Sequence, residues 1–450
     1  MAVNRVSSNI EDIYSLSPMQ KGMLFHCLYA PDSYIYSERS TLTIEGGLDI
    51  DALKRAWEHL CQSHPLFRTV FKWENVNDLI QIVLKKKSPG FEIYDLSSFD
   101  EDERSKRKKD LLDADKRKNF DLAKGPLMRL NVLILGNNKF FISWSYHHIL
   151  IDGWCQSLVM RDLFVSYIAI KGGEPLPDIR RPQYKHYINW LKKQDTGASN
   201  RYWAELLQDF NQPTSISIEN RSKDPINVEI AKHTILLSED VTTALQECGR
   251  LMHVTLNTLI QGAWAILLSR YSMQEDVVFG VTISGRPSSL PGSDEMIGLF
   301  INTLPVRARI DRFDTLQDLL TDLQSQSLRI QEFGYSLLTD VKACSAVPGD
   351  VDLFKSIIVY ENYPTDFKDI VDDGSMRIID NSIEEMTSFD LALLVIPGSQ
   401  LEMTLQYATD LFDSAMISRV LFHLEQILRV LVSDPGLSVS DVDMLTSDER

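Results

Sequence analysis

The sequence has few cysteines, no long apolar run and no excess of positive charge. Its five cysteines are scattered without a C-x-x-C pair, which argues against a disulfide framework or a zinc ribbon. No apolar run reaches the roughly 18 residues that a membrane span needs. Residues 1–20 lack the basic start and apolar core of a signal peptide. We therefore expect a protein of the reducing cytoplasm without a membrane anchor.

The net charge of −17 excludes the concentrated positive surface that nucleic-acid binding normally requires. One basic island exists at residues 104–109 and 116–118, and acidic residues flank it. It is interpreted either as the solvated face of a helix or as a docking surface for an acidic partner.

A chain of 450 residues with 44% hydrophobic side chains is typical of a globular protein with two domains. Residues 171–182 are rich in Gly, Pro and charge, so the boundary is predicted near Arg180. Both halves mix predicted strands and helices, and there is no internal repeat. The pair His147-His148 occurs only in the first half, which predicts one active site per chain.

Local signals predict many of the elements. Ser17 and Gln20 form a capping box at the start of a helix over 18–29, and Asp49 precedes a second helix over 51–62. Gly136-Asn137-Asn138 supplies the turn of a hairpin formed by strands 128–135 and 139–146. The remaining predictions are an extended segment at 67–71, helices at 154–170, 256–271 and 413–431, strands at 277–284 and 356–361, and a hairpin at 391–407.

Residues 147–153 read HHILIDG and connect the predicted hairpin to the helix that follows. Neighbouring residues at a strand end point in opposite directions, so the two histidines should have different roles. An imidazole can accept a proton near neutral pH. Asp152 can hold the loop through a buried ion pair, and Gly153 allows a tight turn. Taken alone, a histidine pair is also compatible with a purely structural role in packing.

Other kinds of site find little support. A zinc site would need a third ligand at a suitable spacing, and neither Cys155 nor His186 provides one. No nucleophile elbow and no phosphate-binding loop of the G-x-x-x-x-G-K-[ST] type is present. The sequence therefore favours neither covalent catalysis nor nucleotide hydrolysis.

The run HHILIDGWC at 147–155 resembles the HHxxxDG signature of nonribosomal peptide synthetase condensation domains, which are relatives of chloramphenicol acetyltransferase. Further family motifs follow in order across nearly the whole chain. They are IYSLSPMQKGMLFH at 13–26, HPLFRT at 64–69, SGRP at 284–287, IGLFINTLPVR at 297–307 and VYENYP at 359–364. Residues 441–450, DVDMLTSDER, are similar to the segment that leads into an adenylation domain.

The resemblance implies an α/β (α+β) fold of two chloramphenicol acetyltransferase-like lobes, arranged as a V-shaped pseudo-dimer around a central tunnel. The expected ranges are 1–180 for the lobe that carries HHxxxDG, 181–438 for the second lobe and 439–450 for the start of a linker to an adenylation domain. The chain would then be a piece of a larger synthetase. Its partners would be the upstream donor and downstream acceptor peptidyl carrier proteins, which present substrates on phosphopantetheine arms. The domain itself would bind no cofactor.

The resemblance also implies a role for each site residue. His148 faces the substrates and acts on the attacking amine, either as a base or as a positioning group, while His147 supports it. Asp152 braces the loop with Arg286 as its partner, and Arg68 is the alternative partner. The backbone N–H near Gly153 is the candidate donor to the tetrahedral oxyanion.

Related functions are weighed against condensation. An epimerisation domain of the same family shares the histidine pair, but Trp154-Cys155 favours condensation. Heterocyclisation domains replace the histidines with aspartates and are excluded. A non-catalytic carrier-docking scaffold and a free-standing acyltransferase that uses coenzyme A stay open as well. Within condensation domains, Leu150, Trp154-Cys155 and residues 361–364 resemble the subtype that joins a D-residue donor to an L-residue acceptor.

Overall fold

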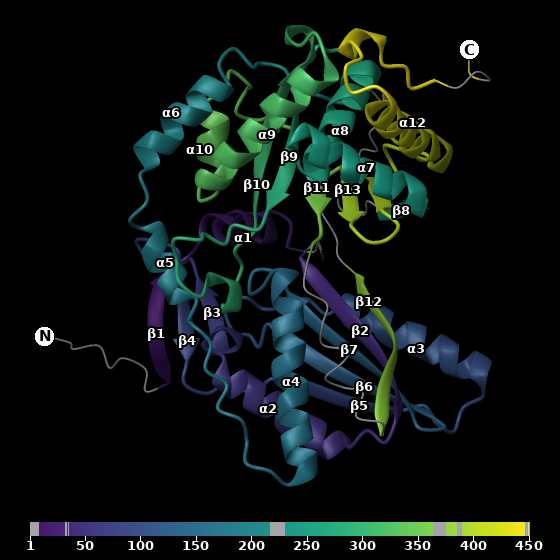
Figure 1. Ribbon diagram of the computed structural model, residues 1–450. Coiled ribbons are helices and arrows are strands. Elements are labelled where there is room, and N and C mark those ends of the chain that lie inside the picture. The colour runs from purple at the N-terminus through teal and green to yellow at the C-terminus, as the bar shows by residue number, and fades with distance from the viewer. Residues whose placement is uncertain are drawn as a thin grey trace, which may run out of the picture. The chain divides into compact units, whose positions relative to one another are not determined.

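The computed structural model describes residues 9–31, 34, 36–216, 230–362, 375–384, 389–445 and 449. The chain forms two compact units, each built from three separate stretches (Figure 1). Unit 1 contains Met1–Gln194, Arg286–Phe300 and Tyr363–Met386, and unit 2 contains Asp195–Gly285, Ile301–Asn362 and Thr387–Arg450. The predicted ranges 1–180 and 181–438 end the first domain earlier. They also do not anticipate the two later stretches that return to unit 1.

Unit 1 is a mixed α/β unit with two sheets. In chain order its elements are β1 (Ile10–Ser15), α1 (Pro18–Tyr29), β2 (Ser37–Gly46), α2 (Ile50–Ser63), the 3-10 helix η1 (Pro65–Arg68), β3 (Thr69–Lys72), β4 (Ile80–Leu84), β5 (Gly90–Asp95), α3 (Glu101–Lys116), β6 (Met128–Gly136), β7 (Lys139–His147), α4 (Trp154–Gly172), α5 (Lys185–Leu191), η2 (Ser293–Glu295) and β12 (Met376–Glu384).

The larger sheet of unit 1 has the strand order β12-β2-β7-β6-β5, and the smaller one β1-β4-β3. The two faces of the larger sheet follow from the alternation of side chains along β7. Trp144 packs edge-on against Trp57 of α2, with ring centroids 6.3 Å apart. Phe141 points to the opposite face, where the ammonium of Lys108 from α3 lies 3.6 Å from its ring centroid. Helix α3 therefore covers the face opposite to α2.

The basic island forms part of α3, which begins at the N-cap Asp100 and has three acidic residues in its first turn. Most of the helix is exposed, with Asp115 as its buried residue. This arrangement agrees with the interpretation of the island as a solvated helix face.

Unit 2 contains a single six-stranded sheet among its described residues, in the order β10-β9-β11-β13-β14-β8. Its elements are α6 (Thr196–Leu206), β8 (Ile230–Leu236), α7 (Glu239–Met252), α8 (Leu256–Ser272), β9 (Asp276–Ile283), β10 (Asn302–Arg309), η3 (Ile310–Arg312), α9 (Leu316–Glu332), α10 (Leu338–Ala343), β11 (Ser356–Tyr360), β13 (Leu391–Ile396), β14 (Glu402–Ala408), α12 (Ser414–Ser433) and η4 (Val439–Asp441).

Strand β11 runs parallel to both of its neighbours, β9 and β13, whereas the other pairings in this sheet are antiparallel. Helix α8 is buried along most of its length and belongs to one large apolar core with α9 and α12. A Cβ atom at Gly262 would overlap the side chain of Leu320, so glycine permits the close approach of α8 to α9.

Several predictions are confirmed almost to the residue. The capping box of Ser17 and Gln20 starts α1, Asp49 caps α2, and Asn137 and Asn138 adopt positive φ in the β6–β7 turn. The extended segment predicted at 67–71 is wrong in its first part. Residues 65–68 form η1, and the strand β3 begins only at Thr69, because Pro65 suits the first position of a helical turn.

Candidate active site

The two histidines follow directly from strand β7. His147 is its last residue and pairs with Ser37 of β2, while the backbone N–H of His148 donates to the Tyr36 carbonyl at 2.8 Å. By the alternation of β7, His147 lies on the face opposite to Trp144. Its side chain is buried, with 7% exposed, whereas His148 is half-buried. The prediction that the two histidines differ in environment is therefore confirmed.

His147 is held as a neutral imidazole. Its Nδ1 accepts a hydrogen bond from the Ile149 backbone N–H at 3.1 Å, so its proton resides on Nε2. This Nε2 lies 3.5 Å from the Cys27 Sγ. Burial, with a smaller contribution from His148, lowers the pKa of His147 to about 3. Burial also raises the pKa of the Cys27 thiol to about 11, so the contact joins two neutral groups.

His148 is held in the opposite tautomer. Its Nδ1 lies 2.7 Å from the Ile151 carbonyl oxygen, which can only accept, so Nδ1 carries the proton and donates it. In the neutral ring, the lone pair is then on Nε2. Among the described residues, no hydrogen-bond partner of Nε2 is present. The ring is thus oriented by its own loop, with Nε2 available to accept a proton.

Asp152 is fully buried and receives hydrogen bonds on both carboxylate oxygens. The Oδ1 atom lies 3.2 Å from Nη2 of Arg286, and the Oδ2 atom accepts from the Phe300 N–H at 2.9 Å. The predicted pairing of Asp152 with Arg286 is therefore present. Arg286 also donates to the Met296 carbonyl at 2.9 Å and stacks on the Phe300 ring, 4.2 Å from its centroid.

Arg68 is not a partner of Asp152. Its guanidinium bonds to Glu11 and to the carbonyl oxygens of Cys61, Gln62 and Leu84. The carbonyls of Cys61 and Gln62 lie in the last turn of α2, where unpaired carbonyls and the negative end of the helix dipole attract a cation. Arg68 therefore stabilises the end of α2, and the pairing of Arg68 with Asp152 is wrong.

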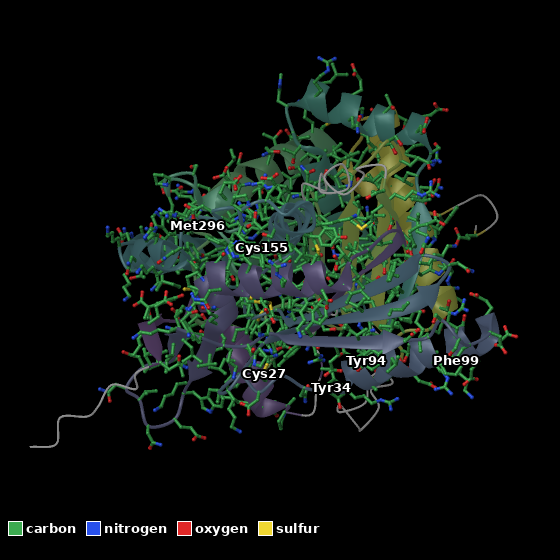
Figure 2. All side chains as sticks on the ribbon, turned by 90° about the horizontal axis from the view of Figure 1, so that it is seen from below. Cys27, Tyr34, Tyr94, Phe99, Cys155 and Met296 are labelled. Carbon is green, nitrogen blue, oxygen red and sulfur yellow. The ribbon has the colours of Figure 1, made fainter. Side chains whose placement is uncertain are left out.

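Cys155 connects the start of α4 to the stretch 286–300, a link that the sequence analysis did not foresee. Its Sγ lies 3.2 Å from each of Asp152 Oδ1, Arg286 Nη2 and the Gly298 carbonyl. The sulfur lies 3.9 Å from the Met296 carbonyl, and both residues are labelled in Figure 2. Burial raises the pKa of this thiol to about 12, so it is present as a neutral thiol.

Gly298 permits this close association, because a Cβ atom there would overlap the ring of Tyr184. The Tyr184 hydroxyl donates to the Leu299 carbonyl at 2.5 Å. The signal in the sequence was the run IGLF at 297–300, which identified a family motif but not its contacts.

Gly153 occupies the N-cap position of α4, with φ −56° and ψ −34°. The Cys155 N–H bonds to the Asp152 carbonyl at 3.0 Å, and the Gln156 N–H bonds to the Gly153 carbonyl at 3.1 Å. No acceptor for the Gly153 N–H is found among the described residues. The first N–H groups of a helix carry partial positive charge, so this end of α4 can stabilise a developing negative charge.

A second buried ionic network lies around His64, which belongs to the motif at 64–69. Asp162 of α4 lies 3.0 Å from His64 Nε2 and receives two hydrogen bonds from Arg181, at 2.7 and 2.8 Å. Burial would raise the pKa of Asp162, but the hydrogen bonds from Arg181 and His64 outweigh burial and lower it. Arg181 lies in the predicted linker, and it also bonds to Glu295. The network fastens this segment to unit 1.

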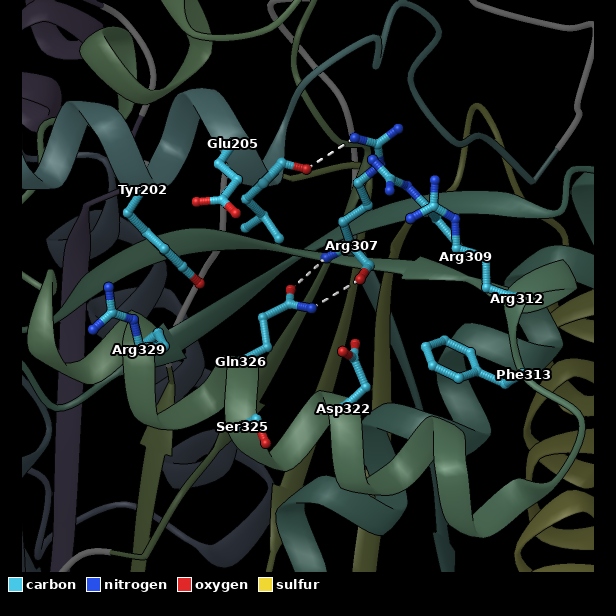
Figure 3. Close-up of a pocket in the computed structure, with 11 residues that line it drawn as sticks. Tyr202, Glu205, Arg307, Arg309, Arg312, Phe313, Asp322, Ser325, Gln326 and Arg329 are labelled. Atoms are coloured by element: carbon cyan, nitrogen blue, oxygen red, sulfur yellow. Dashed lines mark hydrogen bonds between the residues drawn. The ribbon is translucent and has the colours of Figure 1, made fainter.

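A pocket of about 390 Å³ lies in unit 2, between β10, α6 and α9 (Figure 3). It is rich in arginine, but Arg307 is paired with Asp276 at 2.6 Å and Arg329 with Glu332 at 2.7 Å. Its other charged residues are Arg309, Arg312, Glu205 and Asp322. The two remaining positive charges are therefore matched by two carboxylates. Its lining contains no histidine or cysteine, unlike the loop after β7.

Within the described residues, no single helix has the length and apolarity to cross a membrane. The pair α7 and α8 meets these criteria only when the two are joined across a bend of 99°.

Comparison with known proteins identifies the family. A family model described as Condensation domain matches residues 10–450. The chain is 38% identical to one of the linear gramicidin synthase proteins of Brevibacillus parabrevis, over 98% of this chain and 6% of that protein. It is 36% identical to surfactin synthase subunit 3 of Bacillus subtilis (strain 168), over 98% of this chain and 34% of that protein. The chain thus spans only part of the length of these relatives.

Solved structures share the fold. A holo four-domain nonribosomal peptide synthetase bound to AMP and glycine matches with a TM-score of 0.81 and 18% identity, over 99% of this chain and 35% of the other. The starter condensation domain of rhizomide synthetase, in complex with C8-CoA, matches with a TM-score of 0.79 and 18% identity, over 96% of this chain and 98% of the other. This chain belongs to the condensation domain family of nonribosomal peptide synthetases, whose function is peptide bond formation.

Proposed function

We propose that the domain acts as an acyltransferase that joins two carrier-bound substrates. The acceptor is an aminoacyl thioester on a downstream peptidyl carrier protein, and the donor is an aminoacyl or peptidyl thioester on an upstream one. Both arrive on phosphopantetheine arms, so the domain itself needs no bound cofactor. The observation that carries this proposal is the orientation of His148, whose Nδ1–H bond to Ile151 leaves the Nε2 lone pair available.

The chemistry requires a neutral acceptor nitrogen. An α-amino group with a pKa near 7.7–8.0 is largely protonated at neutral pH. The amine nitrogen attacks the thioester carbonyl carbon, a C–N bond forms, and His148 Nε2 takes the proton that the nitrogen loses. When the tetrahedral intermediate collapses, the C–S bond breaks and the proton passes to the departing sulfur. The products are the amide on the acceptor arm and the free thiol on the donor arm.

The same loop can stabilise the charge that develops on the carbonyl oxygen. Gly153 lies at the start of α4, where backbone N–H groups are directed away from the helix, and its N–H is our candidate donor to the oxyanion. Asp152 precedes it and is fixed by Arg286 and by the Phe300 N–H. We assign to Asp152 the positioning of Gly153 and to His147 the support of the adjacent ring.

We further propose that the donor residue has the D configuration and the acceptor residue the L configuration. The resemblance to this subtype rests on Leu150, Trp154-Cys155 and residues 361–364. Of these, residues 363 and 364 lie outside the described residues. We also propose that residues 439–450 begin the connection to an adenylation domain, and residues 446–448 and 450 likewise lie outside the described part of the chain.

The test is a single-turnover condensation assay with donor and acceptor substrates loaded on their carrier proteins. The variant His148→Ala should fold like the wild type and lose roughly 10²- to 10⁴-fold in rate, because it removes the proton acceptor. The control is His186→Ala, which removes an exposed histidine of α5 and should leave the rate unchanged. A wild-type rate for His148→Ala would refute the assignment.

A further inference from the structure

Gln20 is fully buried and lies at the third position of α1, with all polar atoms of its amide engaged. Its Oε1 accepts from the Ser17 backbone N–H at 3.0 Å and from Gln81 Nε2 at 3.0 Å. Its Nε2 donates to the Ile149 carbonyl oxygen at 3.0 Å. A backbone N–H can only donate and a carbonyl oxygen can only accept, so these bonds fix the orientation of the amide.

Ile149 begins the short backbone segment that orients both histidines. Its N–H donates to His147 Nδ1 at 3.1 Å, and the Ile151 carbonyl accepts from His148 Nδ1 at 2.7 Å. The side chains of Ile149, Leu150 and Ile151 are all completely buried. The tautomer of each ring is thus set by the position of this segment, and its first carbonyl is held by Gln20.

We propose that Gln20 is a positioning residue for His148. It holds the Ile149 carbonyl, and thereby the backbone segment whose last carbonyl keeps the proton of His148 on Nδ1. This inference rests on the proposed function, in which the Nε2 lone pair of His148 accepts the proton of the acceptor amine. It assigns to the first motif a role in the chemistry of the HHxxxDG loop, 129 residues later in the chain.

The amide is suited to this role because it combines an acceptor and a donor. The acceptor Oε1 closes the capping box of α1, and the donor Nε2 holds the loop. In Gln20→Glu the carboxylate retains the acceptor but has no N–H to offer, and it places an oxygen opposite the Ile149 carbonyl. Gln20→Met has a similar length without charge and removes both bonds, so it gives a second version of the test should the carboxylate prevent folding.

The matched control is Ser17→Ala. This change removes the Ser17 Oγ that accepts from the Gln20 backbone N–H at 3.2 Å, which is the other half of the capping box. The side-chain amide of Gln20 and its bond to Ile149 are left in place. Ser17→Ala therefore weakens the start of α1 without releasing the loop, and it separates a general effect on the helix from an effect on His148.

The tautomer of His148 can be observed by two-dimensional NMR of protein labelled with ¹⁵N in its histidine rings. The His148 signals are identified by their absence in His148→Ala. In the wild type and in Ser17→Ala, we expect the pattern of an Nδ1-protonated ring. In Gln20→Glu or Gln20→Met, we expect a mixture of the two tautomers, because the Ile151 carbonyl is no longer held in place.

The rate should change in parallel. We expect kcat to fall about 10- to 100-fold in the Gln20 variants with little change in KM, as for a misplaced catalytic group, while Ser17→Ala keeps the wild-type kcat. The inference is overturned if His148 stays Nδ1-protonated in both Gln20 variants, or if Ser17→Ala changes the tautomer equally. Full activity of His148→Ala would instead refute the proposed function, and the NMR result would still decide whether Gln20 holds the ring.

Discussion

At the residue scale, two adjacent histidines have been given opposite properties by their hydrogen bonds. In His147, Nδ1 is the acceptor and burial lowers the pKa to about 3, whereas in His148, Nδ1 is the donor. The alternation of a strand predicted that the two rings would point apart. It could not predict that Cys27 would lie beside His147, because Cys27 comes from α1, 120 residues earlier in the chain.

The pKa of His147 predicts how stability depends on pH. The folded value of about 3 is lower than the value near 6.5 expected in the unfolded chain, so the unfolded chain binds the proton first as the pH falls. Stability should therefore decrease from about pH 6.5 towards pH 3, by up to about 1.4 kcal/mol per pH unit from this group. The variant His147→Gln lacks this contribution.

We expect the wild type to be more stable than His147→Gln at pH 7, and this difference in Tm to narrow between pH 7 and pH 4. Thermal unfolding at a series of pH values measures it, with His186→Ala as the control whose difference from the wild type should stay constant. Parallel curves for the wild type and His147→Gln would show that His147 is not a buried neutral group.

At the scale of elements, predictions succeeded where the information is local. The bounds of α1, α2 and the β6–β7 hairpin follow from caps, turn residues and periodicity that lie within a few residues of each end. Strand β12 was not predicted. Its pairing with β2 brings together residues more than 300 positions apart, and such long-range partners leave no signal in the local sequence.

The stretch 286–300 was recognised by its motifs, and its pairing with the HHxxxDG loop was inferred only from the family resemblance. In the structure, Arg286 and the Phe300 N–H are the partners of Asp152, and Cys155 is packed among them. No spacing rule identifies this arrangement, because its members are distant in the sequence. Burial of Asp152 makes the arrangement energetically significant, since an unpaired buried charge is costly.

This contact predicts a strong coupling between Asp152 and Arg286. Asp152→Asn alone should destabilise the protein by roughly 3–5 kcal/mol, because it leaves the buried guanidinium without its counter-charge. Arg286→Ala should cost a similar amount. The double variant should be far less destabilised than the sum of the two, since neither charge is then left alone.

Chemical denaturation of the wild type, the two single variants and the double variant provides the complete cycle. Arg68→Ala combined with Asp152→Asn is the comparison, because Arg68 binds the end of α2 instead. Its effect should add to that of Asp152→Asn. Additivity of Asp152→Asn with Arg286→Ala would contradict the pairing seen in the structure.

At the scale of the whole molecule, the chain passes between its two units more than once. Unit 1 includes Arg286–Phe300 and Tyr363–Met386, which follow long stretches of unit 2. A chain cut after Gln194 would lack Arg286, Phe300 and β12, and so would lose both partners of Asp152 described above. The loop that carries His148 therefore depends on residues from the second half of the sequence, and one histidine pair gives one site per chain.

The donor's configuration gives the last prediction, which concerns the reaction as a whole. The donor Cα is bonded directly to the carbonyl carbon that the acceptor amine attacks. Inverting this centre exchanges the side chain and the hydrogen, so the carbonyl can keep its place near His148 only if the surrounding residues accommodate the exchange. A displacement of about 1 Å can cost 10²-fold in rate. The disfavoured enantiomer should therefore bind and react poorly.

The measurement is single-turnover condensation with donors that end in a D- or an L-residue and are otherwise identical, loaded on the same upstream carrier protein. Intact-mass analysis of the acceptor carrier then gives the amount of product at each time. We expect the D-donor to react faster, by about 10-fold or more if misplacement of the carbonyl is the cause. His148→Ala should remove the product with both donors, since the same proton acceptor serves either configuration. A faster L-donor would contradict the subtype while leaving peptide bond formation intact, because the resemblance to the D-to-L subtype rests on a few residues near the loop and at 361–364, whereas the family match extends over residues 10–450.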